Sequence, residues 1–109
     1  MIRIKVLRKD NVIKKVNLDG HANYDVYGKD IVCAAVSATY LCTVNAILSI
    51  DSDSIKFLDN ENNQGIEVVN NNKYVNILLD NMIRCLDDLE RQYPTHVKLD
   101  KEEIQWLDF

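Results

Sequence analysis

The chain has 109 residues, of which 47% are hydrophobic and 28% are charged, so we expect one globular domain over residues 1–109. This composition excludes a disordered tail and a disulfide scaffold, and we see no run of about 18 consecutive apolar residues that would predict a membrane span. The formal net charge of -4 argues against direct binding of nucleic acid.

Residues 1–18 predict a β-hairpin. Ile2, Ile4 and Val6 alternate with polar residues, which is the period of a half-buried strand, and the turn residues Lys9-Asp10-Asn11 follow. The returning strand runs from Val12 to Asn17, with an imperfect alternation because Lys14 shares a face with apolar neighbours.

Residues 19–29 predict a loop that is longer than most connections in a compact domain. Gly20 and Gly28 bracket a polar and aromatic stretch that has no clear period. Long loops often carry function, and the competing interpretation is a mobile surface connection. Tyr24 and Tyr27 in this loop fit either a groove for an apolar substrate side chain or ordinary surface positions.

Residues 31–50 predict a helix without glycine or proline. Asp30 is a good N-cap, because its carboxylate accepts from early backbone N–H groups. The helix is apolar and rich in small residues, so we expect it to be mostly buried.

The second half of the chain repeats the order of the first half. A strand at Ser54–Leu58, a turn over 59–65 and a strand at Ile66–Val69 predict a second hairpin, and a helix then runs from Asn70-Asn71-Asn72 to Pro94. His96–Leu99 predicts a last strand, and the apolar tail 104–109 is expected to pack on the domain or on a partner subunit. The order ββαββαβ predicts an α+β two-layer domain with a largely antiparallel sheet and two helices.

Three cysteines and two histidines are the side chains from which most nucleophilic or metal-binding chemistry would have to come. The cysteines contain no CxxC pair, and we interpret them as reduced thiols of a cytoplasmic protein without an export signal. His21 and His96 lie far apart in sequence, and no metal site is expected.

Cys33 is the strongest candidate nucleophile. It falls in the first turn of the predicted helix, where the dipole and free N–H groups favour a thiolate. The carboxylate of Asp30 opposes this effect unless it caps the helix. The competing interpretation is a core cysteine in an alanine-rich helix, and Cys42 and Cys85 are both expected to be inert core residues.

His21 is the candidate partner of Cys33. It follows a strand at the other end of the predicted loop, so the two side chains can meet, and the imidazole would then hold the thiolate and protonate a leaving group. A turn histidine is the competing interpretation. Asp30, Cys33, Ser37 and Tyr40 share one helix face at steps of three and four. Ser37 would support the sulfur or bond back to its own helix.

The motif around these residues resembles a known family. Gly20-His21-Ala22, a gap, and then Gly28-Lys29-Asp30-Ile31-Val32-Cys33-Ala34-Ala35-Val36-Ser37-Ala38 resemble the Prp family of bacterial ribosomal-processing cysteine proteases. The spacing of twelve between His and Cys also matches, and the looser agreement spans the chain.

The resemblance implies an endopeptidase that removes the short N-terminal extension of a large-subunit ribosomal protein. It implies that Cys33 and His21 are catalytic, that Asp30 and Ser37 support them, and that Gly20, with Gly28 at the other end, hinges a loop over the site. It further implies a homodimer without metal or cofactor. N–H groups at the helix start are the candidate oxyanion donors, and the substrate-binding residues are not identified.

Two other hypotheses remain at this point. A non-enzymatic ribosome-associated binding module fits the small size and the absence of cofactor motifs. A thiol redox or acyl-transfer protein built on Cys33 ranks last, because no resolving cysteine lies nearby.

Overall fold

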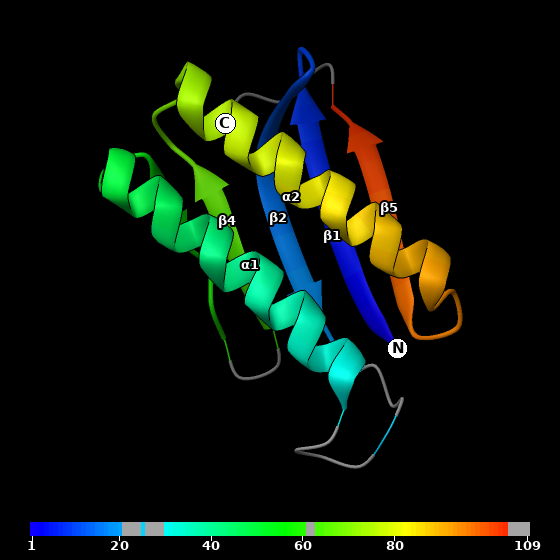
Figure 1. The fold of residues 1–109 in the computed structure, drawn as a ribbon. Coiled ribbons are helices and arrows are strands. Elements are labelled where there is room, and N and C mark those ends of the chain that lie inside the picture. Colours follow the sequence, from blue (N-terminus) through cyan, green and yellow to red (C-terminus); the bar gives the residue numbers. More distant parts are fainter. Residues whose placement is uncertain (21–24, 26–29, 61–62, 105–109) are drawn as a thin grey trace.

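The computed structural model describes residues 1–20, 25, 30–60 and 63–104. Two helices lie side by side on one face of a five-stranded sheet (Figure 1). The elements are β1 Ile2–Lys9, β2 Val12–Asp19, α1 Ile31–Ile50, β3 Ile55–Phe57, β4 Asn63–Val68, α2 Lys73–Gln92 and β5 Val97–Glu103. The predicted order and the two-layer α+β class are confirmed.

The sheet has the order β3-β4-β2-β1-β5. β1 pairs antiparallel with β2, β2 with β4 and β3 with β4, whereas β1 and β5 pair in parallel. The sheet is therefore largely antiparallel, as predicted, with one parallel pair at the β5 edge. The chain between β1 and its parallel neighbour β5 includes both helices, and both cover the same face of the sheet.

Alternation along the central strands sends apolar side chains toward the helices. Ile2, Ile4 and Val6 of β1 are buried, as are Val16 and Leu18 of β2. The register between these strands shifts after Leu7, where Lys14 of β2 is the extra residue. This bulge explains the imperfect alternation in the sequence.

α1 is less buried than its composition predicts. Only one stripe, Val32, Val36, Tyr40, Val44 and Ile47, is buried, while Ile31 and Leu41 are 56% and 51% exposed. The expectation of a mostly buried helix is therefore wrong, because the helix has the sheet on one side and α2 on another, and nothing described covers its outer face. By length and composition alone α1 would also suit a membrane, but a core helix meets the same criterion, and the inner stripe of α1 belongs to the core.

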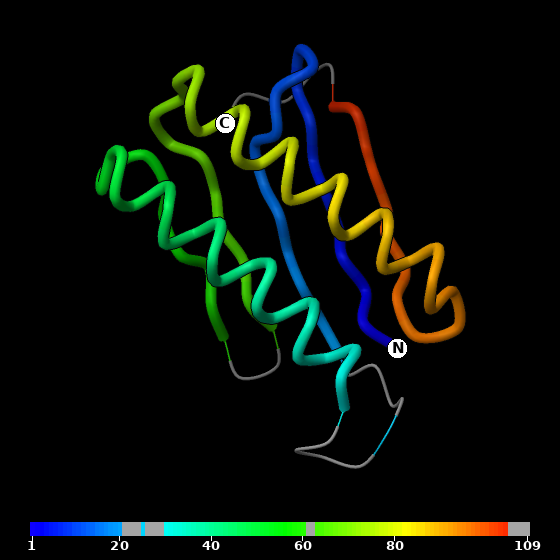
Figure 2. Tube along the Cα trace, viewed as in Figure 1, coloured from blue at the N-terminus to red at the C-terminus, as the bar shows by residue number. Residues whose placement is uncertain are grey.

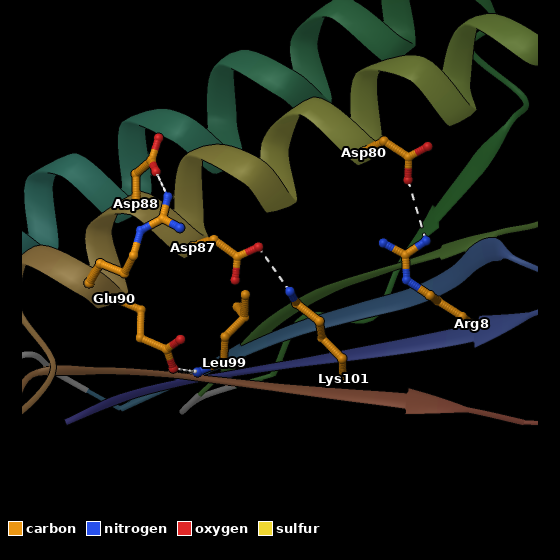
Figure 3. Close-up of polar contacts among 8 residues, drawn as sticks. Arg8, Asp80, Asp87, Asp88, Glu90, Leu99 and Lys101 are labelled. Atoms are coloured by element: carbon orange, nitrogen blue, oxygen red, sulfur yellow. Dashed lines mark hydrogen bonds and ion pairs between the residues drawn. The ribbon is translucent and has the colours of Figure 1, made fainter.

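α2 is amphipathic and is tied to β1 and β5 by polar contacts. Asn72 caps its start by accepting from the N–H groups of Tyr74 and Val75 at 3.0 Å. Asp80, Asp87 and Glu90 reach Arg8, Lys101 and the Leu99 N–H at 3.5, 2.8 and 2.7 Å, and Arg91 pairs with Asp88 on the helix itself (Figure 3).

The strand boundaries in the second half differ from the prediction. β4 begins at Asn63, inside the predicted turn, because the Asn-rich segment pairs with Asp19 and Leu18 of β2. β5 runs to Glu103 rather than to Leu99, since it follows β1 in parallel over its whole length. The N–H of Ile104 donates to the Arg8 carbonyl at 2.7 Å. The rest of the tail predicted to pack, residues 105–109, lies outside the described residues.

Gly20 closes β2 against the start of β1. Its φ is +87°, and an added Cβ would lie 2.4 Å from the Met1 carbonyl oxygen. The atoms that a Cβ would meet belong to the backbone, so no flexible side chain can move aside. Only glycine fits at this position without displacing the backbone.

We expect Gly20→Ala to lower the free energy of unfolding by about 1–3 kcal/mol, because it adds backbone strain to a steric clash. Urea unfolding followed by circular dichroism measures this change. Asp19→Ala, at the exposed neighbouring position, is the matched control and should change stability little. Equal unfolding midpoints for both variants would contradict the assigned contact.

Candidate active site

Asp30 caps the start of α1, as predicted. Its backbone is extended, and its Oδ1 accepts from the N–H groups of Val32 and Cys33, each at 3.0 Å. Its carbonyl accepts the Ala34 N–H at 3.1 Å, the first bond of the helix. The cap holds the backbone of Cys33 and fixes the direction in which its side chain leaves the helix.

The same cap changes the expectation for the oxyanion donors. The N–H groups of Val32 and Cys33 were among the helix-start candidates, but both donate to the Asp30 carboxylate. In this state they are not available to an oxyanion, so other donors would be needed unless Asp30 gives up its cap.

Cys33 is half-buried and packs against the core, whereas Cys42 and Cys85 are exposed. The expectation that Cys42 and Cys85 are core residues is therefore wrong. Their apolar sequence neighbours suggested burial, but each lies outside the buried stripe of its helix. Among the cysteines, Cys33 alone combines a helix start with partial burial.

The face shared by Asp30, Cys33, Ser37 and Tyr40 runs from the surface into the core. Ser37 is exposed one turn beyond Cys33, and Tyr40 is only 2% exposed. Seven residues are almost two helical turns, so Tyr40 lies in line with Cys33, about 10 Å further along the axis. Ser37 is open to solvent beside this line, where it can reach a bound molecule.

The pKa of Tyr40 reflects a charge in the turn between β3 and β4. Burial and, to a smaller extent, the charge of Asp59 raise the pKa of Tyr40 to about 12. Asp59 lies in the turn between β3 and β4, so the Tyr40 hydroxyl is near enough to that turn to be affected by its charge. The sequence predicts a turn over 59–65, but not its proximity to Tyr40, which depends on tertiary packing.

The functional candidates gather at one end of the sheet. The start of α1, the end of β2 at Gly20 and the start of β4 at Asn63 lie there together (Figure 2). His21 and Gly28 were predicted to join them, but they lie outside the described residues, as do Tyr24 and Tyr27. Asp25, between them, is exposed.

The described residues give no metal-binding cluster, and a hollow that they line lies away from Cys33. Across residues 1–20, 25, 30–60 and 63–104, no group of three or more His, Cys, Asp or Glu side chains could hold a metal ion. A hollow of about 220 Å³ is lined by Lys5, Leu7, Lys15, Val16, Asn17 and Leu58. By strand alternation most of these side chains lie on the sheet face opposite the helices, away from Cys33.

Comparison with known proteins resolves the class of the site. The family described as cysteine protease Prp matches residues 1–98. The chain belongs to the Prp family of cysteine proteases. It is therefore a cysteine peptidase, which decides against the non-enzymatic module and the redox or acyl-transfer hypothesis.

The similarity covers almost the whole chain. The ribosomal processing cysteine protease Prp of Staphylococcus aureus (strain Mu50) is 34% identical over 103 residues, which is 91% of this chain and 97% of the relative. The crystal structure of Prp from S. aureus with a covalently linked product peptide has a TM-score of 0.87 at 32% identity, over 94% of this chain and all of that one. The S. aureus structure with a substrate peptide has a TM-score of 0.82 at 29% identity, with the same coverage.

The raised pKa of Tyr40 makes stability depend on alkaline pH. The unfolded chain releases this proton near pH 10 and the folded chain near pH 12, so stability falls as pH rises from 10 toward 12. At pH 11 we expect the wild type to lose roughly 1 kcal/mol relative to Tyr40→Phe, which cannot ionise.

Urea midpoints of both proteins at pH 9 and pH 11 measure this difference. Tyr74→Phe, at a 59% exposed position, serves as the control for removing one phenol. If the stability of Tyr40→Phe relative to the wild type does not increase from pH 9 to pH 11, the pKa of Tyr40 is not raised by folding.

Proposed function

We propose that this chain is an endopeptidase that removes the short N-terminal extension of a large-subunit ribosomal protein, with Cys33 as nucleophile and His21 as its partner. The observation that carries the proposal is Cys33 at the capped start of α1 in a chain of the cysteine protease Prp family. The names of the S. aureus relatives, which describe ribosomal processing and a bound substrate peptide, support the choice of substrate.

The proposed reaction proceeds through a thioester. The Cys33 thiolate attacks the scissile carbonyl carbon, and His21 donates a proton to the departing amine as the C–N bond breaks. Water then hydrolyses the thioester and releases the acid and the thiol. The product peptide linked covalently to S. aureus Prp supports covalent chemistry of this kind.

Asp30 and Ser37 are proposed as supporting residues. Asp30 orients Cys33 through two hydrogen bonds to the first helical turn. Ser37 is exposed one turn further on, within reach of a peptide that passes the sulfur. Gly20 and Gly28 are proposed as the hinge of a loop that closes over substrate, and the φ of +87° at Gly20 supports a special backbone role there.

Peptide cleavage tests the nucleophile. We expect the wild type to cleave a synthetic peptide spanning the extension of the host's ribosomal protein, with products identified by mass spectrometry. Cys33→Ala should reduce the rate by at least about a thousandfold, because the covalent route is lost. Cys42→Ala, one of the two exposed cysteines, is the matched control and should cleave at the wild-type rate. Equal rates for Cys33→Ala and Cys42→Ala would rule out Cys33.

The enzyme is further proposed to act as a homodimer in the cytoplasm. α1 contains no charged residue, and its exposed Ile31 and Leu41 offer an uncharged surface to a second copy. A neutral surface pairs with itself without charge repulsion, unlike other surfaces of a chain with a net charge of -4. Three cysteines that contain no CxxC pair are compatible with a reducing compartment.

A charge on the outer face of α1 tests the dimer. We expect Leu41→Glu to convert the dimer to a monomer in light scattering after gel filtration, because a carboxylate would face its own copy across the interface. Val69→Glu, at another 51% exposed apolar position outside the helices, should leave the dimer intact. A Leu41→Glu protein that remains dimeric would place the interface elsewhere.

A further inference from the structure

The two edges of the sheet differ in how their backbone groups are satisfied. On the β5 edge the Val97 N–H donates to the Tyr93 carbonyl at 3.0 Å. The Leu99 N–H donates to Glu90 Oε2 at 2.7 Å, so α2 and the residue after it cover the start of β5. Residues 101–103, at its other end, are all charged. Covering an edge strand and charging it both oppose the addition of a further strand.

β3 is the other edge, and its hydrogen bonds show which backbone groups point outward. The Leu58 N–H donates to the Gly65 carbonyl of β4 at 2.9 Å. Bonding residues alternate along an antiparallel strand, so Ile55 and Phe57 turn their N–H and C=O groups away from β4. Within the part of the chain that the structure describes, no hydrogen bond uses these outward groups. This edge can therefore accept another strand.

The side chain of Phe57 gives this edge an apolar contact. It lies on the helix-facing side of the sheet together with Ile55 and Ile66, but it is 47% exposed whereas the other two are buried. Strand addition to a sheet edge uses backbone hydrogen bonds for affinity and contacts with alternate side chains for selectivity. An exposed ring beside unpaired backbone groups supplies both.

Carboxylates lie before and after this edge strand. Asp53 is two residues before β3 and Asp59 is two residues after it, and both are exposed. Lys56 is the basic residue between them, and Glu67 of β4 lies opposite it on the outer side of the sheet. The edge therefore combines an apolar centre with acidic ends. It is complementary to an extended peptide that carries basic residues on either side of an apolar one.

The length of β3 favours such a peptide over a second copy of the chain. Three residues extend about 10 Å, and two edges of this size cannot by themselves bury the roughly 1,200–2,000 Å² of a stable dimer. A short segment of a partner held elsewhere needs no larger contact. β3 is antiparallel to β4, which begins at the end of the sheet that carries the site, so Phe57 is the β3 residue nearest that end (Figure 2).

We propose that the β3 edge is a second binding site for the substrate, where an extended basic segment of the ribosomal protein adds to the sheet as a strand while its scissile bond lies at Cys33. Ile55 and Phe57 exchange backbone hydrogen bonds with this segment, and one of its apolar side chains contacts the Phe57 ring. The inference rests on the proposed function, because the substrate is the partner that Cys33 holds. The site raises affinity without taking part in the chemistry, so it acts on KM and not on kcat.

Amide exchange measured by NMR tests the strand addition directly. The protein is the Cys33→Ala variant, and the probe is a synthetic peptide spanning the extension and the start of the mature ribosomal protein. Without peptide, the Ile55 and Phe57 amides should exchange faster than that of Lys56, which points toward β4. Saturating peptide should slow exchange at Ile55 and Phe57 roughly 3- to 10-fold, the effect of one added hydrogen bond at each position.

Two substitutions of Phe57 test the site through kinetics. Phe57→Pro removes an N–H that no bond in the sheet uses, the kind of position where an edge strand tolerates proline, whereas Phe57→Val keeps the N–H and removes the ring. Phe57→Pro should raise the KM for the complete ribosomal protein roughly 3- to 10-fold at unchanged kcat, and Phe57→Val should raise it less. Both variants should cleave a minimal peptide around the scissile bond at the wild-type rate.

Asp53→Asn tests the contribution of charge, with Asp10→Asn as the matched control. Both positions are exposed, and Asp10 lies in the β1–β2 turn with a φ of 54°, which asparagine also adopts. At low ionic strength Asp53→Asn should weaken binding of the longer peptide roughly 2- to 3-fold, and Asp10→Asn should leave it unchanged.

Each result decides the matter. Bound peptide that leaves exchange at Ile55 and Phe57 unchanged overturns the inference, as does a Phe57→Pro protein that loses as much activity on the minimal peptide as on the complete protein. Exchange that slows with protein concentration alone would assign the edge to a second copy. If urea unfolding shows that Phe57→Pro does not fold, the exchange experiment decides alone. A wild type that cleaves neither substrate overturns the proposed function itself, which is a distinct result.

Discussion

The packing of the inner stripe of α1 on the sheet determines where the chemistry can occur. Five residues of the helix, Val32, Val36, Tyr40, Val44 and Ile47, enter the common core and so fix its rotation about its own axis. Once that rotation is fixed, Cys33 leaves the helix beside the stripe and packs against the edge of the core. At roughly 1.5–3 kcal/mol for each fully buried aliphatic side chain, this contact outweighs a single cap or ion pair.

The two helices use different means to stay on the same face. α2 has a polar outer face, and its carboxylates reach Arg8 on β1 and Lys101 and the Leu99 N–H on β5. α1 has no charge along its length and relies on apolar contact and on the Asp30 cap. The helix that carries the proposed nucleophile, Cys33, therefore has no charged side chain of its own. The one charged group at its start is Asp30, which accepts from the Cys33 N–H.

The elements could be predicted from sequence wherever local signals bounded them. α1 begins after Asp30 and α2 ends before Pro94, and both helices were found because a cap or a proline marks the boundary. The start of β4 at Asn63 could not be found locally, because Asn-rich segments favour turns and only pairing with β2 makes this one a strand. The parallel β1–β5 pair is likewise a contact between the two ends of the chain.

The candidate site was predictable in part for the same reason. The sequence placed Cys33 in a first helical turn with Asp30 as its cap, and both follow from local rules. The effect of Asp59 on the pKa of Tyr40 did not follow, because the β3–β4 turn comes near α1 only through tertiary packing. Exposure of Cys42 and Cys85 was also missed, since an apolar neighbourhood in sequence does not show which side of a helix the sheet covers.

The parallel pairing of β1 and β5 also determines at which ends of the sheet β1 begins and β5 ends. Met1 lies against Gly20 at the end of the sheet that carries the site, whereas Ile104 bonds to Arg8 at the opposite end. Residues added before Met1 would therefore leave the fold beside the mouth of the site, where they would compete with an incoming peptide for space. A purification tag or a fluorescent reporter belongs after the last strand, at the end of the molecule remote from Cys33.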